Sequence, residues 1–420
     1  MEKVTAQSGD LVEVHLMKTI YEGTLLESPD NKIVLLKLGS GYNIGFNKKD
    51  ISKIRTVRKA KVSEEKLEIK KDSKKPNIAM VITGGTIAAR YDSKTGGVKW
   101  LDSPESLFKF YPELFEKVNV SKVEIPFMKG SESMNYKDWK KIAKIVEGFL
   151  NDSNIQGVIV THGTDTLHYT SAALSFFLGK VNKPVVLTYS QRSIDRASSD
   201  ANLNLRCSAL AAISNIAEVM LVGHASSGDN FCYAMKGTKV KKLHTSRRDA
   251  FKMVNDKPFA KISADTIEIL RGHHVRNKEK VKSDMHFEDK VALIKFYPGQ
   301  SPDILDYYVK NKYKGIVIEM TGLGHVATKE SGLSWVKKIK EITDKGLVIC
   351  GTSQCINGRV DPLVYSNGRE LLDAGVIFLE DMLSETALIK LSWVLEHKDW
   401  NVKEKMLENV VGEFNKRLEE

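Results

Sequence analysis

The chain has 420 residues and a formal net charge of +11. Hydrophobic residues make up 42% and charged residues 28% of it, which excludes a disordered chain and is typical of a soluble globular protein of two or three domains. The excess of positive charge favours an anionic partner, nucleic acid first, although a basic surface that binds nothing would have the same composition.

Cysteine content and hydropathy restrict the cellular setting. The four cysteines include no CxxC pair, so a disulfide framework and a structural zinc site are not expected. The first residues, MEKVTAQSGDLVEV, contain no apolar signal segment, and no run approaches eighteen apolar residues. We therefore expect a cytoplasmic protein that makes no membrane contact.

Residues 1–58 are predicted to form a small β-barrel of the SH3 or Sm-like kind. Five short apolar or alternating runs are separated by turn-forming residues, and they read LVEVHLM, YEGTLLE, KIVLLKL, YNIGF and ISKIRTV. Such barrels bind nucleic acid or protein partners but carry no chemistry of their own.

A basic linker is predicted over residues 59–76. Between Lys53 and Lys75 there are ten Lys or Arg and four Asp or Glu residues. The segment is either a strip that contacts phosphates or a solvated hinge. The hinge is favoured because no aromatic residues alternate with the charges.

After Pro76 the pattern changes to an α/β fold. Near-continuous apolar runs such as NIAMVIT, GVIVTHG and GIVIEMTG alternate with helix-period segments, including 135–150 and 201–213. This pattern predicts parallel strands with helices on both faces. The charged stretch 276–290 divides a larger unit at 77–285 from a smaller one at 290–400, and residues 401–420 are predicted to form an amphipathic C-terminal helix that docks on the body.

The first chemical signal is the segment VITGGTIAARY at 81–91. Its apolar strand stops at two glycines, which permit a sharp turn and close approach of a ligand. Thr86 would follow this turn at the carboxyl end of the strand, where α/β sheets bind ligands. Taken alone, Thr86 is better explained as a hydrogen-bonding turn residue.

A second hydroxyl-rich turn, THGTDT at 161–166, follows the strand GVIV. It places Thr164 beside Asp165 on a loop at a strand end. A threonine nucleophile requires a base, and the segment 236–252 supplies several lysines without indicating which one would serve. His162 is an alternative base, but a histidine directly after a buried strand more often bonds to its own loop.

Other catalytic patterns are absent from the sequence. The ten histidines show no HExxH or similar metal spacing, and there is no GxSxG or Walker A segment. TGGTIA is not a GxGxxG fingerprint. Neither a metal nor a nucleotide is therefore expected on this chain.

TGGTIA and THGTDT, in this order, resemble the two signature motifs of bacterial-type L-asparaginases, and the likeness extends over residues 76–400. The resemblance implies an asparaginase-like two-domain fold in which Thr86 is the nucleophile and Thr164, Lys242 and Asp165 relay protons. It also implies that Ser131 and Glu132 bind the amino-acid part of the substrate. Backbone N–H groups at Gly85 and Gly163 would stabilise the oxyanion.

Several features depart from free-standing asparaginases. The chain has an additional barrel and linker, and Tyr91 is only a weak match to the family's loop tyrosine. Glu132 stands where those enzymes have Gln, and His325 where many have Asn.

With SQRSIDRASSDANLNL and TSQCINGRV, these departures resemble the D subunits of archaeal Glu-tRNA(Gln) amidotransferases. That resemblance implies a homodimer that hydrolyses Gln or Asn without a cofactor. It also implies a partner E subunit that uses ATP and Mg²⁺ to activate Glu-tRNA(Gln). A stand-alone L-asparaginase and a non-catalytic nucleic-acid-binding protein are the alternatives.

Overall fold

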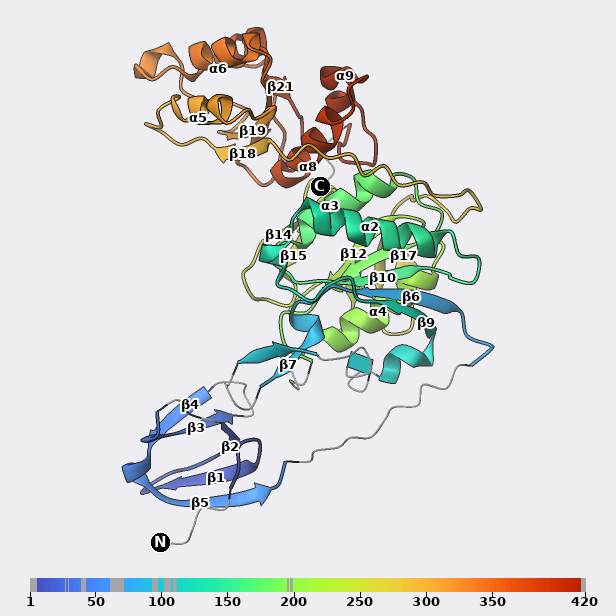
Figure 1. Ribbon diagram of the computed structural model, residues 1–420, viewed down its shortest axis with the longest axis vertical. Coiled ribbons are helices and arrows are strands. Elements are labelled where there is room, and N and C mark those ends of the chain that lie inside the picture. The colour runs from blue at the N-terminus through green and yellow to red at the C-terminus, as the bar shows by residue number, and fades with distance from the viewer. Residues whose placement is uncertain are drawn as a thin grey trace.

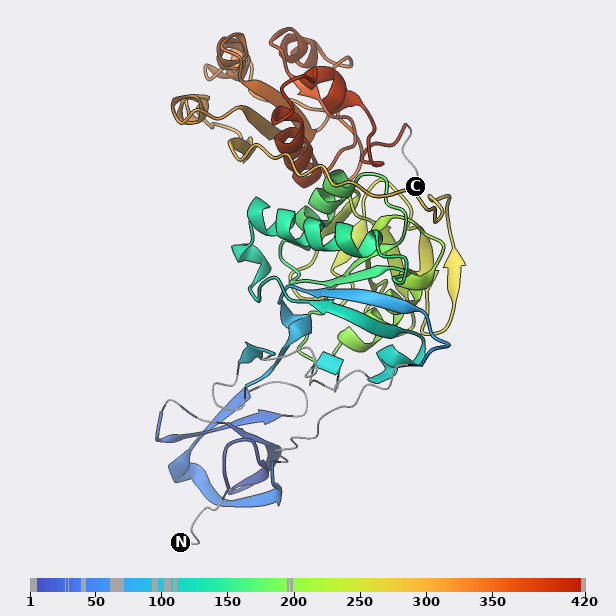
Figure 2. The same cartoon turned by 45° about the vertical axis from the view of Figure 1, so that its right-hand side comes forward.

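The computed structural model describes residues 6–26, 28, 30–38, 43–60, 72–92, 97–101, 107–108, 112–194, 196 and 199–416. These residues form an N-terminal β unit, a larger α/β unit and a smaller C-terminal α/β unit (Figures 1 and 2). Most of the predicted linker, residues 61–71, lies outside the described part.

The N-terminal unit is a curled antiparallel sheet in the order β4-β3-β2-β1-β5. Its strands are β1 (Leu11–Leu16), β2 (Ile20–Leu26), β3 (Ile33–Leu38), β4 (Asn43–Asn47) and β5 (Ile51–Arg58), with a short 3-10 turn at Lys48–Asp50. Val12 and Val14 point inward at alternate positions of β1 and pack with Leu36 and Phe46. The predicted small β-rich domain is confirmed.

The larger unit is built on an eight-stranded sheet in the order β17-β16-β13-β12-β11-β10-β6-β9. Its parallel strands are β6 (Asn77–Ile82), β9 (Asn119–Glu124), β10 (Val158–Thr161), β11 (Val185–Thr188) and β12 (Val219–His224). The antiparallel strands are β13 (Cys232–Lys236), β16 (Ala260–Ile262) and β17 (Ile267–Ile269). Two small two-stranded antiparallel sheets pair β7 (Ala89–Tyr91) with β8 (Val98–Trp100) and β14 (Val240–Lys242) with β15 (Phe251–Met253).

Helices cover both faces of this sheet, as predicted (Figure 1). The helices are α2 (Tyr136–Leu150), α3 (Leu167–Leu178) and α4 (Ala201–Ile213), and 3-10 turns lie at Thr86–Ala88, Pro112–Glu116 and Ser131–Ser133. Alternate residues of β6 point to opposite faces, so that Val81 joins the α2/α3 core while Met80 joins the α4 core. Both faces are therefore apolar, which explains the near-continuous apolar strands.

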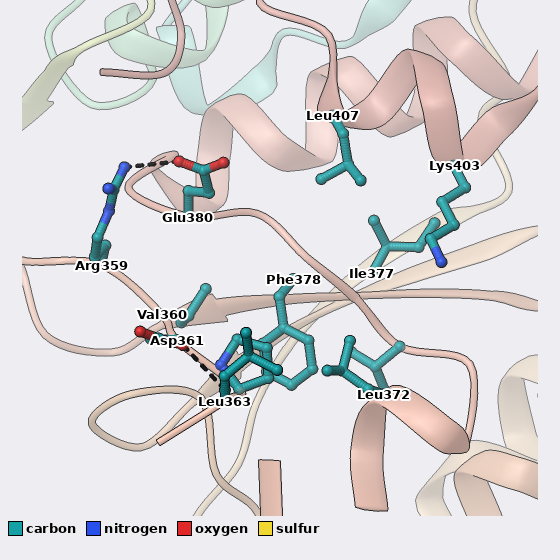
Figure 3. Close-up of a pocket in the computed structure, with 12 residues that line it drawn as sticks. Arg359, Val360, Asp361, Leu363, Leu372, Ile377, Phe378, Glu380, Lys403 and Leu407 are labelled. Carbon is teal, nitrogen blue, oxygen red and sulfur yellow. Dashed lines mark hydrogen bonds and ion pairs between the residues drawn. The ribbon is translucent and has the colours of Figure 1, made fainter. Parts of the chain in front are cut away.

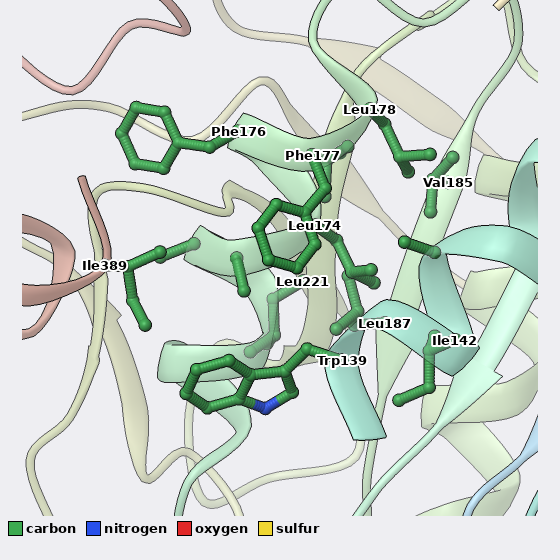
Figure 4. Packing of buried hydrophobic residues seen from close by; sticks show 14 of the residues in the cluster. Trp139, Ile142, Leu174, Phe176, Phe177, Leu178, Val185, Leu187, Leu221 and Ile389 are labelled. Carbon is green, nitrogen blue, oxygen red and sulfur yellow. The ribbon is translucent and has the colours of Figure 1, made fainter. Parts of the chain in front are cut away.

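The smaller unit has a parallel sheet in the order β18-β19-β20-β21. Its elements are β18 (Val291–Lys295), α5 (Ile304–Lys310), β19 (Gly315–Met320), a 3-10 turn (Lys329–Ser331), α6 (Trp335–Asp344), β20 (Val348–Ser353), α7 (Ser366–Asp373), β21 (Ile377–Phe378), α8 (Ser384–Leu395) and α9 (Val402–Leu407). Ile389 of α8 belongs to the same buried cluster as Phe176 and Phe177 of α3 (Figure 4). The two α/β units thus share one core.

The antiparallel edge of the large sheet was not predicted. The sequence pattern indicated only parallel strands, but β13, β16 and β17 continue the sheet beyond β12. β16 and β17 are only three residues long and alternate with charged positions such as Lys261 and Glu268. Such short runs carry little periodic signal.

The predicted C-terminal helix over residues 401–420 is wrong in its extent. Helix α9 ends at Leu407 and residues 408–416 form no helix, while residues 417–420 lie outside the described part. The Lys390 ammonium donates to the carbonyl groups of Met406 and Glu408 and pairs with Glu413 at 2.6 Å in a fully buried site. The Glu413 carboxylate in turn accepts backbone N–H bonds, and these contacts replace the helical ladder.

Another buried ion pair, between Lys239 and Asp381, connects the larger α/β unit to the smaller one. It predicts how strongly the junction of the units contributes to stability. Lys239 and Asp381 are 2.8 Å apart, and both side chains are completely buried. Burial lowers the pKa of Lys239 against the opposing attraction of Asp381. Replacing Asp381 by Asn should leave a buried ammonium without a counter-charge and reduce the free energy of unfolding by about 3–5 kcal/mol.

Denaturant unfolding would measure this loss. Glu341→Gln is the control, because the Glu341–Lys345 pair is 2.7 Å long but exposed. Solvent screens exposed ion pairs, which therefore contribute little to stability, so this variant should unfold nearly as the parent does. Equal stability of both variants would contradict the assignment of Lys239–Asp381 as a buried pair that holds the units together.

Candidate active site

The two hydroxyl-rich turns lie side by side because their strands end at the same level. Ile82 of β6 is in register with Thr161 of β10. Gly85 has φ +79°, and a Cβ atom placed on it would lie 2.4 Å from the Cα and N atoms of Gly163. Only glycine permits this approach, so the glycines of the two motifs bring the turns into direct backbone contact.

A third loop closes around this contact. A Cβ atom on Gly84 would lie 2.4 Å from the Lys129 carbonyl oxygen, and the Lys129 N–H donates to the Thr83 carbonyl at 3.2 Å. Ser131 follows on this loop, and its buried hydroxyl oxygen accepts N–H bonds from Asp165 at 3.1 Å and Thr166 at 3.3 Å. Ser131 thereby fixes the backbone of the second turn.

Lys242 reaches the second turn from β14. Its ammonium donates to the Thr164 hydroxyl at 2.9 Å and to the Asp165 carboxylate at 2.7 Å. The Lys242 side chain is 12% exposed, whereas that of Asp165 is 65% exposed. A threonine hydroxyl, an ammonium and a solvent-facing carboxylate are therefore connected in one hydrogen-bonded line.

Spatial contacts distinguish Lys242 from the other lysines of segment 236–252, which the spacing alone did not do. Each of the others pairs with a different carboxylate: Lys236 with Asp256, Lys239 with Asp381, Lys241 with Glu385 and Lys252 with Asp249. Lys242 is the member that contacts THGTDT.

Thr86 begins the 3-10 turn that follows Gly85, and it is partly buried. Within the described part of the chain, its hydroxyl has no hydrogen-bond partner. The backbone N–H groups of Gly85, Gly163 and Thr164 likewise donate to no acceptor among the described residues. A hydroxyl and several N–H donors are thus available where the two turns meet.

The remaining predicted site residues are less closely connected. Glu132 is exposed, and its carboxylate lies over Gly130 rather than in the Lys242 line. Tyr91 ends β7, but its side chain is outside the described residues. His325 lies in the loop after β19, and its ring packs edge-on against Tyr365 at 5.3 Å.

His162 bonds to its own loop. Its ring nitrogens contact the Gly163 carbonyl at 2.7 Å and the Thr170 hydroxyl at 2.9 Å. Complete burial lowers the pKa of His162 to about 4, so the ring is neutral at pH 7. These contacts favour a loop-bonding role over a general base.

The sequence did not single out Thr83 and Thr166 as individual contributors. The Thr83 hydroxyl donates to the Thr161 carbonyl at 2.8 Å, and the Thr166 hydroxyl donates to the Ser131 carbonyl at 2.7 Å. Both residues belong to the two motifs. Their position close to the motif glycines is the feature of the sequence from which their role could have been predicted. They hold the loops together.

Family models match almost the whole chain. The model "GatD N-terminal domain" matches residues 6–57, "Asparaginase, N-terminal" matches 77–274, and "Glutaminase/Asparaginase C-terminal domain" matches 290–406.

Relatives that are similar over their full length show whether the chain belongs with the stand-alone asparaginases or with the amidotransferase D subunits. The D subunit of the glutamyl-tRNA(Gln) amidotransferase of Pyrococcus furiosus is 47% identical over 407 residues, covering 94% of this chain and 91% of the relative. The protein of the same name from Thermococcus kodakarensis is 44% identical and covers 99% of this chain and 96% of the relative. The chain belongs to the D-subunit family of these amidotransferases.

Solved structures similar to this D-subunit family member include asparaginases. The thermostable L-asparaginase from Thermococcus kodakarensis has a TM-score of 0.72 and 29% identity, covering 81% of this chain and 100% of that one. L-asparaginase I from Vibrio cholerae has a TM-score of 0.68 and 27% identity, covering 81% and 99%. The predicted asparaginase-like fold and the predicted D-subunit resemblance are confirmed.

A large hollow of this D-subunit family member lies away from the two turns. It has a volume of about 430 Å³ and lies in the smaller unit, where apolar residues such as Leu363, Phe378 and Leu407 line it (Figure 3). Arg359 and Glu380 pair at 2.7 Å at its border. None of the predicted catalytic residues lines it.

Gly85→Ala tests the contact between the two turns. Gly85 combines φ +79° with ψ 171°, a conformation that only glycine adopts readily, and the added methyl group would overlap Gly163. We expect a loss of about 3 kcal/mol in the free energy of unfolding. Gly148→Ala is the control, since that position in α2 has no neighbouring atom within 4 Å and should be neutral or slightly stabilising. Equal melting temperatures of the two variants would contradict the close contact.

No helix in the described ranges is both long and apolar enough to cross a membrane.

Proposed function

We propose that this chain is the ammonia-generating subunit of a glutamyl-tRNA(Gln) amidotransferase. It hydrolyses the side-chain amide of Gln or Asn, and its partner E subunit uses the ammonia to convert Glu-tRNA(Gln) to Gln-tRNA(Gln). One structural observation carries the amidase assignment: the Lys242 ammonium bonds to both Thr164 and Asp165 on a turn that touches the turn of Thr86. The full-length similarity to D subunits supports the coupling to a partner.

The proposed reaction begins at Thr86. Its hydroxyl oxygen attacks the amide carbon, and the hydroxyl proton moves through Thr164 to Lys242 while the Lys242 ammonium passes one of its protons on to the Asp165 carboxylate. The departing amide nitrogen takes up a proton and leaves as ammonia, so an ester with Thr86 is formed. Water then hydrolyses the ester, releases the acid and returns a proton to Thr86.

The available backbone N–H groups at Gly85 and Gly163 support stabilisation of the oxyanion in both steps. Thr164 and Asp165 also lie just before α3, whose N-terminus favours negative charge. Asp165, with its exposed carboxylate, would receive the substrate α-ammonium. Ser131 and Glu132 are the further proposed contacts to the amino-acid portion of the substrate.

An ammonia-release assay can test the coupling to the partner separately from the amidase activity. Ammonia release from Gln and Asn should be measured with the chain alone, and then with the E subunit and Glu-tRNA(Gln). We expect release to rise markedly in the complete system, in which the partner requires ATP and Mg²⁺. Unchanged release would favour a stand-alone asparaginase, and no release under any condition would favour the non-catalytic nucleic-acid-binding alternative.

The predicted cytoplasmic homodimer is part of the same proposal. It is supported by the resemblance to D subunits, and sedimentation of the purified chain would test its oligomeric state. A monomer at micromolar concentration would contradict it.

A further inference from the structure

Asp284, His286 and His397 form a compact cluster outside the amidase site. The His286 Nδ1 atom lies 2.6 Å from one carboxylate oxygen of Asp284, and the His397 Nε2 atom lies 2.9 Å from the other. All three residues place one metal-binding atom within 4.8 Å of the others. We propose that these side chains bind a divalent transition-metal ion, with Zn²⁺ as the first choice.

The donor set matches the chemistry of zinc. Two imidazole nitrogens and one carboxylate oxygen are typical Zn²⁺ ligands, at about 2.0–2.2 Å from the metal. In a tetrahedral site such atoms are separated by about 3.3 Å, so small side-chain rotations suffice to accommodate the ion. His286 is 60% exposed, which leaves the fourth coordination position open to water.

His397 is already oriented as a metal ligand. Its Nδ1 atom donates to the Trp393 carbonyl at 2.8 Å, which directs Nε2 toward Asp284. Its ring stacks on Trp400 with centroids 3.6 Å apart and planes 6° apart. A backbone carbonyl that fixes the second nitrogen is a recurring support of histidine ligands. His397 also lies just beyond the C-terminus of α8, where positive charge is favoured.

The cluster joins two parts of the fold. Asp284 and His286 lie on the connector between the α/β units, and His397 follows α8 of the smaller unit. The connector is already held on both sides, because the Asp284 N–H donates to the Phe177 carbonyl of α3 and the Glu288 N–H donates to the Ser392 carbonyl of α8. A bound metal would therefore tie the connector to the end of α8 and stabilise the junction of the two units.

The test is metal binding by the full-length chain after chelator treatment. Titration with Zn²⁺ should show one strong site per chain and raise the melting temperature, and Co²⁺ should give the visible absorption of a nitrogen- and oxygen-ligated ion. His286→Ala should weaken binding at least about 100-fold and abolish the melting-temperature shift, as should Asp284→Asn.

Two further variants complete this experiment. His274→Ala is the matched control, because His274 is similarly exposed and likewise pairs with one carboxylate, that of Glu218, but belongs to no cluster of three metal-binding side chains among the described residues. It should bind Zn²⁺ as the parent does. His286 is exposed, so its variant is expected to fold even if the His397→Ala variant does not.

Unchanged affinity in His286→Ala and Asp284→Asn, or no stoichiometric binding by the parent, would overturn the proposal and leave a hydrogen-bonded cluster. Either result is independent of the amidase assignment.

Discussion

Thr86→Ala is expected to lower ammonia release from Gln or Asn by at least about 10³-fold. The variant lacks the only atom proposed to attack the amide carbon, and the remaining N–H donors can position the substrate but cannot form the ester. The fold should tolerate the change, because Thr86 is partly buried and its hydroxyl has no partner among the described residues. The measurement is the rate of ammonia release per folded chain, with the melting temperature as a check on folding.

Thr86→Ser is the control for this variant. It keeps a hydroxyl at the same position after Gly85 and should retain a substantial part of the activity. If Thr86→Ala releases ammonia at a near-normal rate, Thr86 is not the nucleophile. If both variants are equally inactive with unchanged melting temperatures, the threonine methyl group is also required to hold the hydroxyl in place.

The parallel core was predictable because its chemistry is local. Apolar runs with helix-period segments between them require strands that are covered on both faces, and β6, β10 and β11 follow that pattern with every residue from Val158 to Thr161 buried. Helix α2 was equally well marked, since Asn135 and Asp138 form a capping box at its start. Hydrophobic periodicity and helix caps each involve residues only a few positions apart, so they can be recognised in the sequence alone.

The C-terminal segment shows why other features were not predictable. Met406, Val410 and Phe414 have helical spacing, yet the helix ends at Leu407 because Lys390, from another helix, donates to the carbonyl groups of the segment. A partner that is distant in the sequence overrides a local preference. The antiparallel strands at the sheet edge are similar, since β16 forms by pairing with β13 rather than by its own pattern.

The candidate site likewise has one part that could be predicted from the sequence and another that could not. The glycines of TGGT and THGT were visible in the sequence, and their packing depends on glycine itself. The identity of the catalytic lysine was not predictable from spacing, because segment 236–252 contains several lysines. Ion pairs with residues distant in the sequence hold the others elsewhere and leave one to contact the second turn. The resemblance to asparaginases named Lys242, and it is the lysine that contacts Thr164 and Asp165.

Lys242→Met should reduce ammonia release by about 10²–10⁴-fold, the range that proton transfer by a positioned group contributes. Methionine preserves much of the length of the side chain but removes the bonds to Thr164 and Asp165. The loss should fall mainly on kcat, because Lys242 is proposed to move protons rather than to hold substrate. Folding should be little affected, since the Asp165 carboxylate that loses its partner is 65% exposed and stays hydrated.

Two variants separate proton transfer from charge. Lys241→Met is the positional control: Lys241 is the neighbouring residue, but its ammonium bonds to Glu385 at 2.6 Å, so the rate per folded chain should stay within about tenfold of the parent. Lys242→Arg keeps the positive charge beside Asp165, but a guanidinium cannot release its proton near neutral pH. We therefore expect Lys242→Arg to be nearly as slow as Lys242→Met. High activity in Lys242→Arg would show that Lys242 acts as a fixed charge that orients Asp165, and the proton path would then have to run through Thr164 alone.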